Sequence, residues 1–179
     1  MRTRIALFCV GAAVAALTTV IAAAQTSSAA LEARLQILED REAIRALLVS
    51  YASTLDNRDF AGFEQLWARD AEFIGGGGNS AKGPAAIRDL LRGLLGKNGA
   101  ATPGHDFHLV MNQTVDVKGD TATGFSRGTW VSTSPENNRL QVSIIANYYD
   151  QFVREGGRWK FRRHQIGGEP PAESTASKR

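Results

Sequence analysis

The stretch LEDREAIRALLVSYASTLDNRDFAGFEQLWARDAEF, residues 38–73, decides the fold of this 179-residue chain. Apolar residues recur in it at the i, i+3, i+4, i+7 spacing that places them on one face of an α-helix. Asp56 lies on the flank of that face, because each helical residue turns about 100°. The pattern predicts an amphipathic helix over residues 40–56 with one carboxylate at the rim of a buried stripe, formed by Ile44, Leu47, Leu48, Tyr51, Ala52 and Leu55.

The first residues of the chain have the pattern of a secretory signal peptide. Arg2 and Arg4 precede an apolar run over residues 5–24 that ends in small residues. A membrane anchor is the competing interpretation, since the run approaches the roughly 20 residues that span a bilayer. We predict a signal peptide over residues 1–24, whose cleavage makes the protein periplasmic or secreted, without stable membrane insertion. Cleavage also removes Cys9, the only cysteine, and with it any disulfide or thiol nucleophile.

The charge balance argues against a nucleic-acid partner. The full chain carries a formal charge of +3, and removing the signal segment takes away two arginines and no acidic residue. The mature chain is therefore close to neutral and has no electrostatic footprint for nucleic acid. Its length is sufficient for one domain with a real core. We predict a lead-in segment over residues 25–37, a domain over residues 38–167, and a disordered tail over residues 168–179.

The order of the patterns predicts an α+β domain, because a helical first half precedes a strand-rich second half. Asp59 is a helix N-cap, and the helix after it has an inner face of Phe60, Phe63, Leu66 and Trp67. A short strand over residues 71–74 and a glycine-rich break follow. Pro84 then begins a third helix, continuing over residues 85–95, with inward residues Ile87, Leu90, Leu91 and Leu94.

The second half has the period of two that is typical of antiparallel strands, over residues 107–117, 121–133, 140–154 and 158–166. In the first of these strands, one face is apolar from Phe107 to Val117 and the other is mixed, from His108 to Asp116. We expect the mixed face to line a pocket and the apolar face to meet core or a partner subunit. A three-residue hairpin loop places His108 opposite Trp130. Small residues on the Trp130 face, Ala122, Gly124, Ser126 and Gly128, leave room there for a ligand.

Three segments together resemble one known family. These are the stretch quoted above, FHLVMNQTVDVKGDTATG at residues 107–124, and YYDQFVREGGRWKFRRH at residues 148–164. They resemble the SnoaL-like branch of the nuclear transport factor 2-like (NTF2-like) superfamily over residues 38–166. The resemblance implies a cone of three helices packed on a strongly curved, mixed, mainly antiparallel sheet that encloses a pocket. It implies little about the reaction, because this superfamily hosts dehydratases, isomerases, cyclases, epoxide hydrolases and proteins with no known reaction.

The resemblance also implies site residues. Tyr51 and Asp56 match the tyrosine and aspartate of the first helix in the bile-acid and scytalone dehydratase-like members, and His108 resembles their strand histidine. Such a set suits dehydration or isomerisation next to a carbonyl, where one group moves a proton and another donates to the developing enolate. The base of the ketosteroid isomerase pattern falls near Gly75 or Gly76, which argues against that activity.

Each candidate has a structural alternative. Tyr51 could be a core tyrosine, and Asp56 could pair with Arg58 or bond the turn at the helix end. His108 could be a wall residue, and His105 in the preceding loop is the alternative histidine. Two neighbouring histidines without a third clear ligand predict no metal, and the glycine-rich segments lack the sequence of a phosphate-binding loop, so we predict no cofactor.

Two functions follow. The first is a cofactor-free lyase or isomerase acting on a small, largely apolar, cyclic carbonyl compound, with Asp56 and His108 as the acid-base pair and Tyr51 polarising the carbonyl. The second is a non-catalytic binding or scaffold module with the same cavity. We predict substrate contacts from Trp67, Val110, Asn112 and Trp130. We also predict a homodimer through the outer sheet face, because Phe107, Leu109 and Met111 otherwise leave an apolar band in water.

Overall fold

The computed structural model describes residues 2–96, 106–134 and 136–169, with side chains from residue 28 onward. The chain divides into two units, residues 1–39 and residues 40–179. Helix α1 (Arg2–Asp56) forms the described part of the first unit and continues into the second. Among the described residues, no helix combines the length and the apolar character that crossing a membrane requires. The predicted signal peptide and lead-in segment belong to the first unit, and cleavage stays a prediction.

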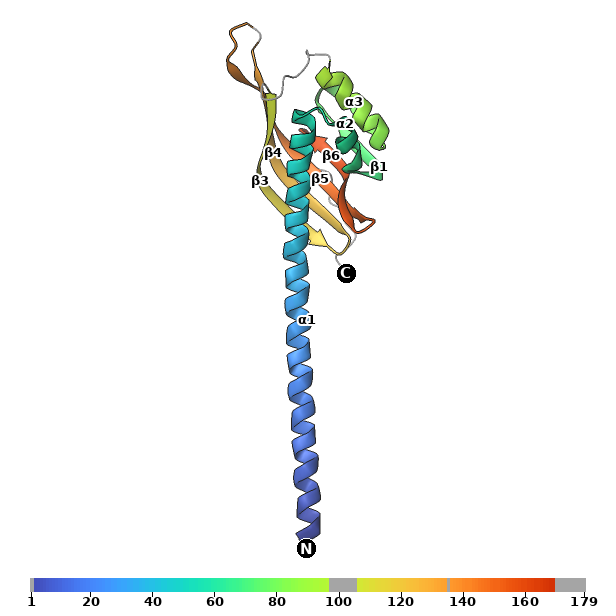
Figure 1. The fold of residues 1–179 in the computed structure, drawn as a ribbon, viewed down its shortest axis with the longest axis vertical. Coiled ribbons are helices and arrows are strands. Elements are labelled where there is room, and N and C mark those ends of the chain that lie inside the picture. Colours follow the sequence, from blue (N-terminus) through green and yellow to red (C-terminus); the bar gives the residue numbers. More distant parts are fainter. Residues whose placement is uncertain (1, 97–105, 135, 170–179) are drawn as a thin grey trace. The chain divides into compact units, whose positions relative to one another are not determined.

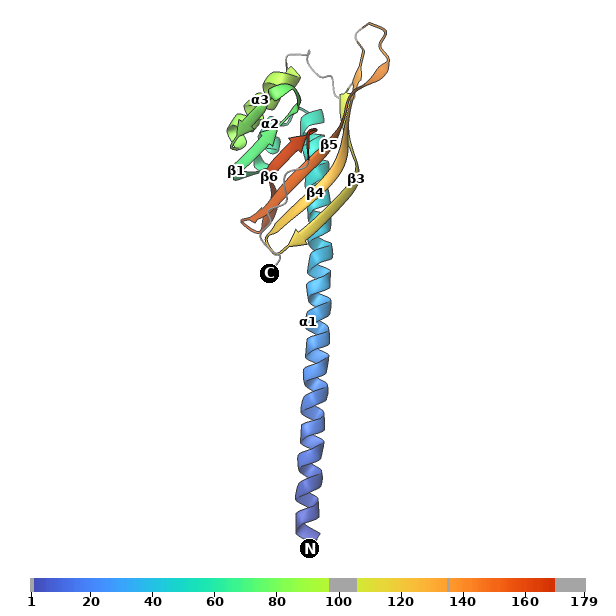
Figure 2. The ribbon, with the colours of Figure 1, turned by 180° about the vertical axis from the view of Figure 1, so that it is seen from behind.

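The second unit has the predicted α+β architecture, with three helices packed against one curved sheet (Figures 1 and 2). The last part of α1 buries the predicted stripe, with Ala52 alone half-exposed. Helix α2 (Phe60–Gln65) begins at the predicted N-cap, where the Asp59 side chain accepts a hydrogen bond from the Gly62 backbone N–H at 2.8 Å. Helix α3 (Pro84–Gly96) buries Ile87, Leu91 and Leu95, whereas Leu94, which we expected to point inward, is 38% exposed.

The sheet has six strands in the order β2-β1-β6-β5-β4-β3. It is mixed, because β1 and β6 pair in parallel and every other neighbouring pair is antiparallel. The strands of the sheet are β1 (Trp67–Ile74), β2 (Ser80–Lys82), β3 (Asp106–Lys118), β4 (Thr121–Thr133), β5 (Leu140–Glu155) and β6 (Arg158–Ile166). The last four of them, β3 to β6, lie within one residue of their predicted bounds.

The segment after α2 differs from the prediction. Leu66 caps α2 and Trp67 begins β1, so neither residue belongs to a helix. The reason is pairing with a distant strand, since the Phe161 backbone N–H donates to the Leu66 carbonyl at 2.9 Å and Trp67 lies opposite Phe161. Strand β2, which we did not predict, extends the same edge by pairing with β1.

A β-bulge in β3 corrects the predicted division of its faces. Met111 lies opposite Arg127 and Thr114 opposite Phe125, so two residues of β3 face one residue of β4. Asn112 in this bulge has φ +53°. Beyond the bulge the parity reverses, so that Val115 and Val117, not Thr114 and Asp116, share the inner face with His108. The hairpin turn holds two residues rather than three, and the bulge restores the predicted pairing of His108 with Trp130.

The small residues of β4 make room for aromatic rings rather than for a ligand. A Cβ at Gly128 would lie 1.8 Å from the Tyr148 ring, and one at Gly124 would lie 2.8 Å from the Phe152 ring. Both rings come from β5 and are buried. They join an aromatic core between the helices and the sheet that also holds Tyr51, Phe63, Trp67, Phe73 and Phe161.

Candidate active site

His108 and Asp56 form a hydrogen-bonded pair between β3 and the end of α1. The distance from His108 Nδ1 to Asp56 Oδ1 is 2.6 Å. The backbone N–H of His108 also donates to both carboxylate oxygens, at 3.0 and 3.1 Å. The carboxylate therefore holds both the ring and the main chain of His108. The His108 side chain is 10% exposed and that of Asp56 is 21% exposed, so the pair lies at the edge of the core rather than inside it.

Tyr51 packs beside this pair. Its ring meets that of His108 edge to face, with 6.4 Å between centroids. The residue is only 2% exposed. Burial raises the pKa of the Tyr51 phenol well above 10, and the nearby Tyr148, Asp150 and Asp56 raise it further. Tyr51 is thus a neutral hydrogen-bond donor at any ordinary pH.

The four predicted substrate contacts differ in burial and in their distance from His108. The Trp130 ring stacks on the His108 ring, with 6.1 Å between centroids and an interplanar angle of 12°. Val110 lies on the same face of β3 as His108 and is half-buried against the core. Trp67 is 1% exposed within the core, whereas Asn112 is exposed in the bulge. The structure thus brings Trp130 and Val110 close to His108. The alternative histidine, His105, lies outside the described residues.

Arg58 does not pair with Asp56, although it lies two residues beyond it. Its guanidinium binds Asp106 instead, at 2.5 Å. The Asp56 carboxylate is thereby left to His108. Of the alternatives set out above for Asp56, pairing with Arg58 is therefore wrong.

A second His–Asp pair, which the sequence did not reveal, lies in the core. His164 Nδ1 is 2.6 Å from Asp150 Oδ1, and the two side chains are 0% and 1% exposed. The turn between β5 and β6 would place Asp150 opposite Arg163, but a register shift after Gln151 moves it opposite His164. Tyr51 packs between the two pairs, with its ring 4.8 Å from that of His164. The alternation of residues along β5 and β6 predicts this His–Asp pair only when the register shift after Gln151 is already known.

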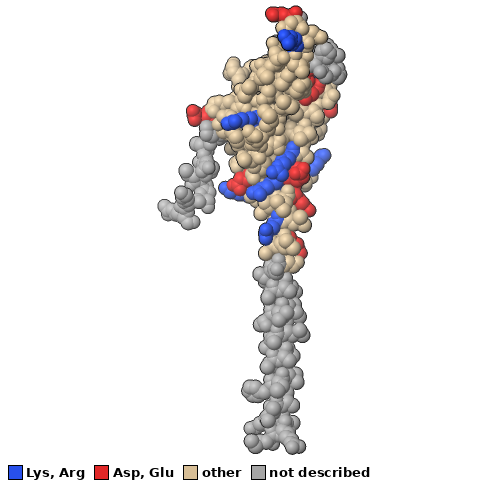
Figure 3. All heavy atoms as spheres, turned by 90° about the vertical axis from the view of Figure 1, so that its left-hand side faces the viewer, with Lys and Arg blue, Asp and Glu red and all other residues tan. Residues whose placement is uncertain are grey.

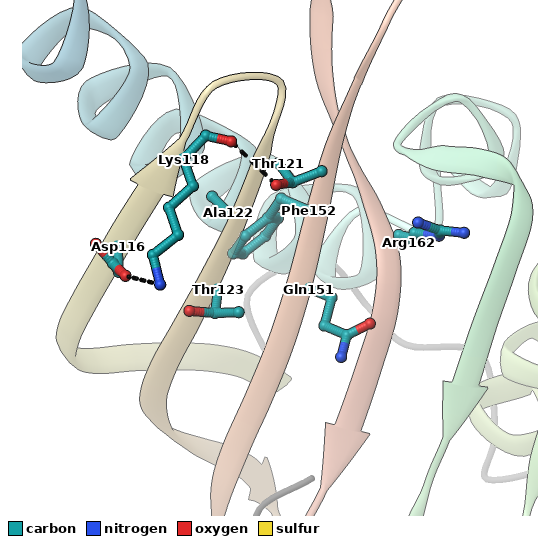
Figure 4. A pocket seen from close by; sticks show the side chains of 8 residues that line it. All are labelled: Asp116, Lys118, Thr121, Ala122, Thr123, Gln151, Phe152 and Arg162. Carbon is teal, nitrogen blue, oxygen red and sulfur yellow. Dashed lines mark hydrogen bonds and ion pairs between the residues drawn. The ribbon is translucent and has the colours of Figure 1, made fainter. Parts of the chain in front are cut away.

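Other features of the surface lie away from this site. A hollow of about 130 Å³ opens beside the β3–β4 hairpin turn, where Lys118 pairs with Asp116 (Figure 4). On the face shown in Figure 3, the basic side chains of the described residues lie among acidic ones. Within the described residues, no three His, Cys, Asp or Glu side chains converge as metal ligands do. The His108 pair is therefore the arrangement best suited to chemistry.

The comparisons with known proteins agree with this fold. No curated protein matches the sequence significantly. Among solved structures, an NTF2-like protein with a cystatin-like fold from Novosphingobium aromaticivorans is 28% identical, with a TM-score of 0.66 over 82% of this chain and 90% of that chain. A scytalone dehydratase-like protein from the same organism is 23% identical, with a TM-score of 0.61 over 72% and 83%. A hexachlorocyclohexane dehydrochlorinase (LinA, type 2) is 24% identical, with a TM-score of 0.61 over 78% and 99%.

The sequence also matches a family model directly. The model for the SnoaL-like domain covers residues 36–165, which include both His–Asp pairs. The chain belongs to the SnoaL-like domain family and has the NTF2-like fold.

Proposed function

We propose that this protein is a small-molecule lyase or isomerase in which His108 and Asp56 transfer the proton. The observation that carries the proposal is the 2.6 Å hydrogen bond between His108 Nδ1 and Asp56 Oδ1. A carboxylate can only accept, so Nδ1 donates and the lone pair of the neutral imidazole lies on Nε2. Nε2 makes no hydrogen bond within the described residues. His108 is thus arranged as a base, and Asp56 stabilises the imidazolium that forms.

The proposed reaction is an elimination next to a carbonyl group. His108 Nε2 takes a proton from the carbon beside the carbonyl, and the electrons of that C–H bond form an enolate. The Tyr51 phenol donates a hydrogen bond to the enolate oxygen, a role that needs the neutral phenol that its raised pKa provides. The enolate then expels a hydroxyl group from the next carbon, and this group leaves as water with the proton from His108. Returning the proton to another carbon instead gives isomerisation.

The surroundings of His108 support a flat, largely apolar and cyclic substrate. The indole of Trp130 lies nearly parallel to the imidazole, and Val110 adds an apolar contact on the same face. A π-face of this kind favours a ring stacked against it. Among the structural neighbours, a dehydrochlorinase takes its name from another elimination. A cyclic carbonyl compound with a hydroxyl group two carbons from the carbonyl carbon combines these requirements.

Proton abstraction can be tested before the substrate is known. Cyclic ketones incubated in D₂O exchange the protons beside the carbonyl when a base removes them, and NMR measures the rate. We expect the protein to accelerate exchange, and Asp56→Asn and His108→Ala to lower the rate by about 10² to 10⁴. Asp116→Asn, an exposed carboxylate on the same strand, is the matched control and should leave the rate unchanged. Ligand binding without exchange or elimination would favour the non-catalytic binding module.

We also propose that the protein is exported. Arg2, Arg4 and the apolar run after them have the charge and length pattern of a signal peptide. Mass spectrometry of protein recovered from cell fractions tests this. A mature N-terminus near residue 25 in the periplasm or medium is the expected result. Intact residues 1–24 in the membrane fraction would instead favour the uncleaved anchor.

The outer face of the sheet supports a homodimer as the assembled state. The large apolar side chains that it exposes lie on β3 and β5, the two neighbours of β4, with Leu109 and Ile145 both opposite Thr129. Their exposed fractions are 43% for Leu109 and 73% for Ile145, and Met111 and Val142 are also exposed. A second copy presents the same face, so a two-fold contact would bury both.

A further inference from the structure

Helix α1 ends in a turn that normally uses glycine. The backbone N–H of Asp59 donates to the Thr54 carbonyl at 2.8 Å, and that of Arg58 donates to the Leu55 carbonyl at 3.1 Å. These are the two hydrogen bonds of a Schellman motif, with Arg58 at its left-handed position. Arg58 has φ +57°, a conformation that disfavours residues with a Cβ. An arginine here therefore indicates that its side chain has a use.

The Arg58 guanidinium connects the helix end to the start of β3. One nitrogen, Nη1, donates to the Leu55 carbonyl at 2.5 Å, and Nη2 donates to Asp106 Oδ2 at 2.5 Å. The two side chains are 18% and 10% exposed. The other carboxylate oxygen of Asp106 is buried, with no hydrogen-bond partner in the described part of the chain. Arg58 is thus the principal partner of a nearly buried carboxylate.

This ion pair runs alongside the His108–Asp56 pair. Arg58 lies two residues after Asp56, and Asp106 lies two residues before His108 on the same strand. Two side-chain links therefore join the same two segments, one from the last residue of α1 and one from the turn after it. Because residues i and i+2 of a strand point to the same face, Asp106 and His108 approach the helix end together.

We propose that Arg58 and Asp106 are positioning residues for the His108–Asp56 pair. Their ion pair fixes the end of α1 against β3, and it also keeps the guanidinium away from the Asp56 carboxylate. Without Asp106, two carboxylates lie within two residues of Arg58 along the chain. Asp59 caps α2 through the Gly62 backbone N–H, and Asp56 is the carboxylate where the guanidinium would compete with His108. The inference rests on the proposed function for its catalytic meaning, but the hydrogen bond that it concerns can be measured separately.

The experiment measures the Nδ1–H protons of both histidine pairs by NMR in the full chain. Short hydrogen bonds to carboxylates give separate, strongly downfield proton signals, and His164 provides an internal control with the same 2.6 Å distance. We expect Asp106→Ala to abolish the His108 signal and to leave the His164 signal in place. The double variant Arg58→Gly with Asp106→Ala should restore part of the His108 signal, because the competing guanidinium is gone.

Matched variants separate positioning from backbone strain and from folding. Asn138→Gly relieves another non-glycine residue with a left-handed backbone, at φ +54°, and should change neither signal. If Asp106→Ala loses both signals, the isosteric Asp106→Asn decides the question, with a weakened His108 signal and an unchanged His164 signal expected. A His108 signal that stays unchanged in Asp106→Asn and in Arg58→Gly would overturn the proposal.

Activity gives the second measurement. In the exchange assay, Arg58→Gly should lower kcat by up to about 10²-fold with little change in KM, as expected when a catalytic group is displaced by about 1 Å. Loss of the His108 signal in Asp106→Ala, together with an inactive wild-type protein, would leave the positioning role standing while the proposed function fails. Loss of activity with an intact His108 signal would refute the positioning role instead.

Discussion

The buried pair of His164 and Asp150 allows a quantitative test of how the core is held together. The imidazole lies among five aromatic side chains, whose ring centroids are 4.7 to 6.3 Å away. Replacing His164 by phenylalanine keeps this packing but leaves Asp150, 1% exposed, without its hydrogen-bond partner. Removing one member of a buried pair costs about 3–5 kcal/mol. We expect His164→Phe to lower the free energy of unfolding by this amount.

Replacing both members should cost much less. Exchanging a buried pair for apolar residues of similar volume is often neutral or stabilising. The double variant Asp150→Leu with His164→Phe should therefore be more stable than His164→Phe alone. The coupling free energy between the two substitutions should reach about 2–3 kcal/mol, because the residues are in direct contact.

Urea unfolding at pH 7, followed by tryptophan fluorescence and far-ultraviolet circular dichroism, measures these quantities. The wild type, both single variants and the double variant form a complete double-mutant cycle. A cost for His164→Phe below about 1 kcal/mol, the value of an ordinary hydrogen bond, would refute the reasoning. Additive costs in the double variant would refute it as well, since they would mean that neither side chain depends on the other.

Three further predictions concern pH, packing and assembly. Burial raises the pKa of Tyr148 to about 12, so the contribution of this phenol to stability is complete below pH 10 and is lost as the pH rises to 12; alkaline unfolding titrations should show a smaller loss in Tyr148→Phe. Gly128→Ala should cost about 1–3 kcal/mol in a urea titration, because the new methyl group would overlap the Tyr148 ring; an unchanged unfolding midpoint would mean that the ring moves freely. Ile145→Lys should convert the proposed dimer to a monomer in sedimentation at about 10 µM without altering circular dichroism, and a wild type that is already monomeric there would contradict the proposed dimer.

The elements that could be predicted from the sequence depend on local chemistry. The stripe from Ile44 to Leu55 is buried as expected, because its spacing alone determines which helix face is apolar. Asp59 is an N-cap for an equally local reason, since its side chain bonds a backbone N–H three residues away. The pairing of His108 with Trp130 was also predicted, although a bulge and a shorter turn compensated each other to give it.

The features that could not be predicted depend on contacts between distant segments. Trp67 fits the inner face of a helix by its spacing, yet pairing with β6 draws it into a strand. The register shifts in β3 and β5 move side chains to new neighbours, and no residue pattern near Met111 or Gln151 predicts these shifts. The His164–Asp150 pair depends on one of these shifts. Arg58 is a third case, because its left-handed backbone conformation is explained by the ion pair with Asp106, a residue distant in the sequence.

The two His–Asp pairs have the same 2.6 Å hydrogen bond and different surroundings. A base must be reached by its substrate, and a fully buried His164 can be reached only if the core opens. His108, at 10% exposure and beside a carboxylate at 21%, lies where a ligand can approach. The same chemistry thus supports two roles, one in the proposed reaction and one in holding β5 to β6. Variants of His108 should therefore lose activity at nearly constant stability, whereas variants of His164 should lose stability first.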